Sequence, residues 1–174
     1  MNYAPFAKGR FPTASGNCEL YSAALEAQGL DPLPTYIPPH EDPQVRPDLA
    51  TRFPLQLLSP PAPSFLNSSF VNVDGLRKIA GEPTLEIHPK DADRRDIKNG
   101  QWVRVYNDRG RFRARALVGE TVKFGTVVTQ GIWWNKYSPD GTNCNATTST
   151  RLTDLGGGAT FFDNLVQVAA EHDV

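Results

Sequence analysis

The sequence predicts a mainly β fold with short helices. Hydrophobic residues make up 39% and charged residues 21% of the 174 residues, values close to those of ordinary globular domains. The 15 prolines and 14 glycines indicate many turns and little long helix. Short apolar or alternating segments of strand length recur between turn residues. A domain of this length buries roughly 70% of the surface that its unfolded chain exposes, so a substantial core is expected.

The first 52 residues predict a helix followed by an extended strap. Segment 18–30 places apolar residues at helical spacing and ends at Gly29, so we expect a short helix there. The dense prolines between residues 31 and 54 argue against both helix and central strand, and they favour an extended arm over a surface. We therefore expect residues 1–52 to form a helix and a Pro-rich strap, and residues 53–174 to form the main domain.

The rest of the chain predicts short strands and two short helices. The strand candidates share an apolar or alternating pattern between turn residues, and they are 53–59, 84–88, 101–107, 111–118, 126–134 and the closing segment 161–170. Helices are expected at 71–80, with Asn72 or Asp74 as the cap and Gly81 as the stop, and at 89–96.

A β-hairpin is predicted where two of these strands are joined by a three-residue turn. Gly110 in this turn can adopt the left-handed conformation that such a connection needs. Beyond the turn, Arg111, Arg113 and Arg115 share one face of the strand. We interpret this row as the solvated face of an antiparallel sheet.

Charge and composition argue against several functional classes. The net charge is −1, with 18 basic and 19 acidic residues, so nucleic acid is not an expected partner. The sequence has no apolar run of membrane-spanning length and no apolar core of a signal peptide, so we expect a soluble, cytoplasmic chain without membrane insertion. Cys18 and Cys144 stand far apart without metal-ligand spacing; a disulfide stays open, and free thiols are the expectation.

No catalytic or metal-binding constellation emerges from the residues. Paired carboxylates, a nucleophile elbow and a metal motif are all absent from the sequence. Three consecutive glycines, 156–158, lack any phosphate-loop pattern around them, so we interpret them as a place where the backbone turns or passes close to another element, with a close approach to a cofactor as the lesser alternative.

Three stretches of sequence resemble one protein family. Segment 83–118 (PTLEIHPKDADRRDIKNGQWVRVYNDRGRFRARALV) is similar to the central pattern of the molybdopterin-dinucleotide-binding domain in the dimethyl-sulfoxide-reductase superfamily: strand, His-Pro, Asp-Ala, short helix, polar-Gly-polar, then a hairpin with glycine at its turn. Segment 10–22 (RFPTASGNCELYS) resembles the stretch that precedes this domain, and segment 151–168 (RLTDLGGGATFFDNLVQV) resembles its closing region.

This resemblance implies a fold, a cofactor and partners. The fold would be a double-psi β-barrel of six or seven strands over residues 53–174. The cofactor would be molybdopterin guanine dinucleotide, with molybdenum or tungsten carried by the parent enzyme, and the metal ligand and the other catalytic domains would lie upstream in the same enzyme. A start just before a motif found inside such enzymes is unusual, so we expect a fragment or subunit that binds and orients the cofactor without turnover of its own.

The resemblance also points to two polar segments that would form the cofactor site. Segment 54–70 looks like the first strand and cofactor loop of the family, although Pro63 and Ser64 stand where the family often has a histidine pair. A dinucleotide needs small hydroxyls and backbone N–H groups for its phosphates and amides for its pterin edge. The expected cofactor-binding residues supply hydroxyl, amide and aromatic groups: Ser59, Asn67, Ser68, Ser69, Trp134, Asn145, Thr147, Thr148 and Phe161.

Two other functions remain open at this point. One is a stand-alone double-psi barrel that binds a peptide or partner protein, and the other is a small hydrolase or decarboxylase on a related barrel, for which the sequence shows no activated nucleophile. The discriminating feature is whether the polar segments 59–69 and 143–148 converge on one cleft or lie at opposite ends of the barrel.

Overall fold

The computed structural model describes residues 3–171, and it divides the chain into two compact units, Met1–Pro38 and Pro39–Val174. The first unit contains one short helix, α1 (Ala23–Glu26). The Ser22 hydroxyl caps it by accepting a hydrogen bond from the Leu25 N–H, and Gly29 follows it at φ 75°. The helix predicted over 18–30 is therefore present but much shorter, because its cap and its glycine stop lie only seven residues apart.

The second unit begins with a segment where the strap prediction is partly wrong. Residues 47–52 form helix α2 (Pro47–Arg52), with Pro47 at its first turn. Proline is tolerated there because the first helical N–H groups have no partner inside the helix in any case. Proline density therefore excludes a helix interior but not a helix start, and α2 packs against the last strand of the barrel.

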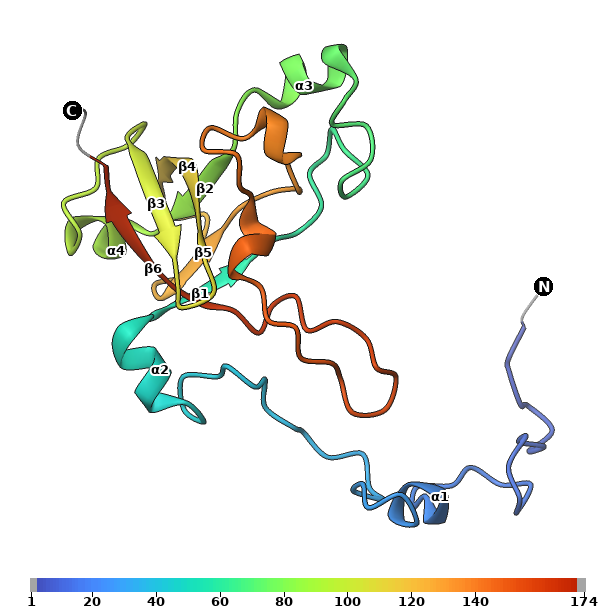
Figure 1. Ribbon diagram of the computed structural model, residues 1–174. Coiled ribbons are helices and arrows are strands. Elements are labelled where there is room, and N and C mark those ends of the chain that lie inside the picture. Colours follow the sequence, from blue (N-terminus) through green and yellow to red (C-terminus); the bar gives the residue numbers. More distant parts are fainter. Residues whose placement is uncertain (1–2, 172–174) are drawn as a thin grey trace. The chain divides into compact units, whose positions relative to one another are not determined.

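Six strands close into one barrel (Figure 1), which confirms the mainly β prediction. Their order around the barrel is β1-β5-β2-β4-β3-β6. The β1–β5 and β2–β4 pairs are parallel and the other neighbours are antiparallel, the arrangement of a double-psi β-barrel. The bounds are β1 (Leu55–Leu58), β2 (Thr84–Ile87), β3 (Trp102–Tyr106), β4 (Arg111–Val118), β5 (Thr126–Val128) and β6 (Leu165–Ala170).

Five of the strands alternate between buried and more accessible residues, as their sequences predict, whereas β6 begins with two buried residues, Leu165 and Val166. The interior is filled by branched aliphatic side chains and small alanines, with Ala92 and Ile97 closing it as expected. Strand β5 is the exception in length, because it ends at Val128 although its apolar pattern continues to Trp134. The backbone turns away at Gly131, with φ 74°, and the two tryptophans after it pack outside the barrel interior.

Four short helical segments lie in the connections between the barrel strands of the described chain. Helix α3 (Asp74–Ala80) and helix α4 (Pro89–Asp93) match the two predicted helices, and the 3-10 turns are η1 (Asn135–Tyr137) and η2 (Cys144–Thr147). The predicted side-chain cap of α3 is wrong, because Val73 occupies the cap position and no side chain bonds there. Among the described residues, no helix is long and apolar enough to cross a membrane.

Two predictions about the β3–β4 hairpin also need correction. Gly110 does not have a positive φ, so it does not form the predicted left-handed turn. A glycine is needed there for another reason: a Cβ atom at this position would lie 2.6 Å from the Ala146 carbonyl oxygen. The arginine row is not simply solvated. Arg113 and Arg115 pair with glutamates and place their guanidinium groups 5.1 and 4.2 Å from the centre of the Trp102 ring.

Candidate functional site

The first polar segment leaves the barrel directly after β1. Ser59 is half-buried at the strand end, and the chain then makes a tight turn between Leu66 and Ser69, whose N–H groups each donate to the other's carbonyl, at 3.2 and 2.8 Å. Asn67 occupies this turn at φ 52°, a conformation that asparagine tolerates better than most residues. The predicted residues Asn67, Ser68 and Ser69 are therefore held in an ordered turn and exposed to solvent.

The two tryptophans after β5 anchor this segment. The Trp134 Nε1–H donates to the Ser68 carbonyl at 2.6 Å, and the Trp134 ring stacks on Tyr137. Trp133 is buried and meets Phe65 edge to face, with ring centroids 5.2 Å apart. Trp134, predicted as a cofactor residue, is thus brought together with Ser68, and it remains half-buried with part of its surface accessible.

The second polar segment is built around η2. The Asn143 side chain accepts a hydrogen bond from the Asn145 N–H and donates to the Trp133 carbonyl at 2.8 Å. Cys144 points inward, and burial raises the pKa of its thiol to about 11. The exposed Asn145 side chain lies on the outside of this turn. One asparagine side chain therefore both caps η2 and joins it to the tryptophan segment.

Both polar segments lie on the same side of the barrel, with the chain that follows β5 between them (Figure 1). Two hollows lie beside the two polar segments, one next to each, and Trp133 lines both. One, of about 230 Å³, is lined by Ala62, Phe65 and Trp133 among others, and a narrow one of about 10 Å³ is lined by Trp133, Asn143 and Cys144 among others. Trp133 thus forms a shared wall between the segments, and neither hollow is lined by both of them.

The predicted threonines of the second segment differ in their surroundings. Thr147 is fully buried; its hydroxyl donates to the Cys144 carbonyl at 2.9 Å and accepts from the Asn164 side chain at 3.0 Å. Thr148 is half-buried, and its hydroxyl also faces the Cys144 carbonyl, at 3.3 Å. The Thr147 hydroxyl is therefore used within the protein, whereas Asn145 and Thr148 keep accessible surface.

Phe161 belongs to a third element, the long connection between η2 and β6. It is exposed, and the neighbouring Phe162 carbonyl accepts a hydrogen bond from the Gln56 side chain of β1. The connection folds back on itself through a bridge between Leu152 and Ala159, and Gly157 turns it at φ 60°, in agreement with the predicted glycine turn. Among the described residues, no hydrogen bond joins Phe161 to the other predicted site residues.

The structure contains a buried polar network beside this site that the sequence does not predict. Glu41, whose side chain is 7% exposed, forms a two-pronged ion pair with Arg109 at the β3–β4 turn, with N–O distances of 2.5 and 3.1 Å. The same turn carries Asn107, whose amide nitrogen lies 2.8 Å from the Thr147 carbonyl and 3.1 Å from the side-chain oxygen of Asn164. The residues of this network come from four separate stretches of chain.

The sequence contained only a partial signal for this network. Asn-Asp-Arg-Gly reads as a turn, and turn residues are usually explained by their backbone conformation alone. Glu41 stands among prolines in a segment that predicts exposure, so nothing local marks it as buried. Asn164 is the best signal available: an amide placed directly before an apolar strand is a group that needs partners once buried.

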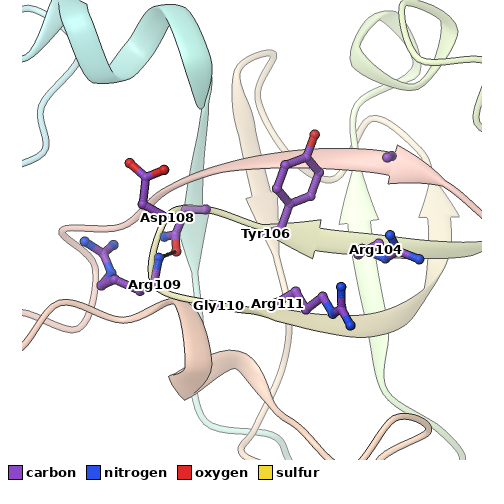
Figure 2. Close-up of a pocket in the computed structure, with 8 residues that line it drawn as sticks. Arg104, Tyr106, Asp108, Arg109, Gly110 and Arg111 are labelled. Carbon is purple, nitrogen blue, oxygen red and sulfur yellow. Dashed lines mark hydrogen bonds between the residues drawn. The ribbon is translucent and has the colours of Figure 1, made fainter.

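The outer face of the same hairpin forms a separate hollow of about 490 Å³ (Figure 2). Its lining comes from both strands of the hairpin, the turn and Ala169 of β6, and Figure 2 labels Arg104, Tyr106, Asp108, Arg109, Gly110 and Arg111. None of the predicted site residues lines it. Among the described residues, no group of three or more His, Cys, Asp or Glu side chains is placed to hold a metal ion.

Comparison with known proteins assigns this chain to a family. Residues 55–165 match the family described as the molydopterin dinucleotide binding domain. The chain is 40% identical over 164 residues to a probable oxidoreductase, YoaE, of Bacillus subtilis, and 37% identical over 173 residues to the dimethyl sulfoxide reductase DmsA of Escherichia coli. These matches cover 94% and 90% of this chain but only 23% and 20% of the two relatives.

A solved structure has the same fold. Acetylene hydratase from Pelobacter acetylenicus superposes with a TM-score of 0.77 at 24% sequence identity, over 92% of this chain and 25% of that protein. At this identity the likeness concerns the fold alone. The chain thus spans about a fifth to a quarter of the length of the proteins that it matches.

Proposed function

Because this chain belongs to the molybdopterin dinucleotide-binding domain family of the dimethyl-sulfoxide-reductase superfamily, we propose that it binds and orients a molybdopterin guanine dinucleotide within a larger oxidoreductase. The remaining domains of that enzyme would supply the metal ligand and the substrate site. When bound, the cofactor supplies the molybdenum or tungsten centre and the electron-transfer chemistry. This chain's own task is to hold the organic part of the cofactor.

The observation that carries the proposal is the joining of two polar segments through one tryptophan pair. Trp134 bonds to the Ser68 carbonyl, and the adjacent Trp133 carbonyl receives the Asn143 amide, so hydroxyl, amide and aromatic groups gather on one side of the barrel. A dinucleotide is long and presents both phosphates and heterocycles, and it needs these groups spread over an extended surface rather than in one small pocket.

The donor set of the described residues fits this group. Ser68 and Ser69 offer exposed hydroxyls that suit phosphate oxygens, and Asn145 offers an exposed amide that suits a pterin edge, which both donates and accepts. The Thr148 hydroxyl, three residues beyond Asn145, donates to the Cys144 carbonyl at 3.3 Å and can still accept a hydrogen bond, and the open part of Trp134 offers a flat surface for a ring. The Thr147 hydroxyl takes no direct part in this assignment, because it is already bonded within the protein.

The test is an analysis of nucleotide and metal in the native polypeptide that contains this chain. The protein is purified from its source, and acid hydrolysis of the bound cofactor is followed by chromatography of the released nucleotides. We expect guanine nucleotide together with molybdenum or tungsten in the same fraction. Cytosine nucleotide would contradict the guanine form but not dinucleotide binding. A protein free of both metal and nucleotide would contradict the proposal and favour the partner-binding alternative.

A further inference from the structure

An ion pair joins the start of the second compact unit to the tip of the β3–β4 hairpin. Both oxygens of Glu41 meet the Arg109 guanidinium, and one of them also accepts the Leu165 N–H at 2.9 Å. The Glu41 side chain is 7% exposed and that of Arg109 32% exposed, so solvent screens the pair only in part. Glu41 is thereby fixed between the hairpin and the first residue of β6.

Arg109 and Asn107 extend this link to the second polar segment. The Arg109 Nε–H donates to the Thr147 carbonyl at 2.6 Å, and the Asn107 amide approaches the same oxygen at 2.8 Å. The Asn164 side chain completes the connection, because its oxygen faces Asn107 while its nitrogen donates to the Thr147 hydroxyl. The carbonyl and the hydroxyl of one threonine are thus held by three side chains from two other segments.

The β3–β4 hairpin also packs directly against the backbone of η2. Gly110 approaches Ala146 so closely that a Cβ atom on Gly110 would lie 2.6 Å from the Ala146 oxygen. Side-chain bonds to Thr147 and backbone contact at Ala146 together leave η2 little freedom to shift. The same turn carries Asn145, which is exposed, and ends at Thr148, which is half-buried.

We propose that Glu41 and Arg109 are positioning residues, which set the place of η2 and thereby of the cofactor contacts at Asn145 and Thr148; this rests on the proposed function. Glu41 orients the Arg109 guanidinium, and Arg109 in turn fixes the Thr147 carbonyl. Neither residue touches the cofactor in this account.

The network is separate from the hydrophobic interior of the barrel. The core is made of aliphatic and aromatic side chains from the strands together with Ala92, Ile97 and Cys144 of η2, whereas the network is made of polar side chains outside that cluster. Loosening the network is therefore expected to free η2 while the strands stay paired. This expectation separates a positioning role from a general contribution to stability.

The test compares three variants of the chain and of the native enzyme that contains it. Glu41→Gln removes the charge that orients Arg109, and Arg109→Lys keeps the charge but removes the guanidinium fork. The control is Asp108→Asn, which breaks the neighbouring ion pair between Asp108 and Arg52. These two side chains are 54% and 57% exposed, so the pair should contribute little to stability. Amide hydrogen exchange is measured at Ala146 and Thr148, whose N–H groups bond within η2, and at Val103 and Val105 in β3.

In Glu41→Gln and Arg109→Lys we expect exchange at Ala146 and Thr148 to accelerate roughly tenfold or more, with β3 unchanged. The native enzyme carrying either variant should lose nucleotide during gel filtration, whereas Asp108→Asn should retain it. Unchanged exchange in η2, or equal acceleration in β3 including complete unfolding, would overturn the positioning role. Absence of nucleotide from the unmodified enzyme would instead contradict the proposed function. The exchange result would still show whether Glu41 and Arg109 hold η2 in place.

Discussion

The Trp134 indole donates its N–H to the backbone carbonyl of Ser68, 66 residues earlier in the chain, at 2.6 Å. This bond fastens an exposed turn to the segment that follows β5. Three of the expected cofactor-binding residues, Asn67 to Ser69, lie in that turn. Its geometry therefore depends on a side chain that is remote in sequence.

Trp134→Phe removes this donor while keeping an aromatic ring. We expect the variant to be less stable by about 0.5–1.5 kcal/mol, because the lost bond is a single neutral hydrogen bond in a partly exposed place. Urea unfolding measures the stability, and hydrogen exchange at the Ser69 N–H, which bonds to the Leu66 carbonyl, measures the local effect. Tyr137→Phe is the control, since it alters the ring stacked on Trp134 by one hydroxyl only. Equal effects of the two substitutions would contradict this account.

Gly131→Ala should be strongly destabilising for two additive reasons. Gly131 has φ 74°, and a Cβ atom there would lie 2.8 Å from the Ala62 Cβ. The matched control is Gly125→Ala, where φ is 84° but the space is open, so it isolates the conformational cost of about 1–2 kcal/mol. We expect Gly131→Ala to exceed the control by about 1–3 kcal/mol in urea unfolding. Adding Ala62→Gly should recover part of that excess, and no recovery would argue against the steric cause.

Gly110→Ala tests the close approach of the hairpin to η2. The obstructing atom is a backbone oxygen, so the added methyl group should displace one of the two segments at a cost of about 1–3 kcal/mol. Gly119→Ala, at a position with open space and ordinary φ, should change the stability by less than about 0.5 kcal/mol. Thermal or urea unfolding of the two variants gives the comparison. A neutral Gly110→Ala would show that the hairpin does not press on η2.

The buried thiol of Cys144 predicts a pH dependence. Burial raises its pKa from an ordinary value of 9.0 to about 11. The unfolded chain loses this proton above about pH 9 while the folded chain retains it, so the free energy of unfolding should fall as the pH rises from 9 to 11, by an amount on the order of 2 kcal/mol. Cys144→Ala should remove this component. Urea unfolding at both pH values provides the check, and an identical slope in the two proteins would exclude the thiol as its source.

Asn145→Ala separates binding from stability. Because the side chain is exposed, the free energy of unfolding should change by less than about 0.5 kcal/mol. In the native enzyme the same substitution should lower the amount of nucleotide retained, since it removes the amide that we propose to face the pterin. Thr150→Ala, at another exposed position a few residues further along, is the control and should retain nucleotide as the unmodified protein does. Full retention by Asn145→Ala would remove this residue from the site.

The sequence predicts the barrel well because local pattern and tertiary environment agree there. In β4, for example, Phe112, Ala114 and Ala116 alternate with arginines, and the structure buries all three. The prediction and the structure differ where a contact between residues far apart in sequence outweighs the local pattern. The apolar run after Val128 reads as strand, but Gly131 diverts it so that Trp133 packs on Phe65 instead.

The sequence indicates which residue types lie in the polar segments but not the contacts that hold those segments in place. Serines and asparagines between strands indicate polar loops, and the structure joins two of the proposed site residues, Ser68 and Trp134, by a hydrogen bond. The burial of Glu41 depends on Arg109, 68 residues away, and no local pattern encodes such a partner. The internal use of the Thr147 hydroxyl depends likewise on Asn164.

The central claim is that the two polar segments together contact a molybdopterin dinucleotide, and hydrogen exchange of the native enzyme tests it most directly. The enzyme is prepared with cofactor and, from cells unable to make molybdopterin, without it. We predict that the cofactor slows exchange in both 59–69 and 143–148, while the outer hairpin face around Asp108 is unaffected. Unchanged exchange in both segments would contradict the claim.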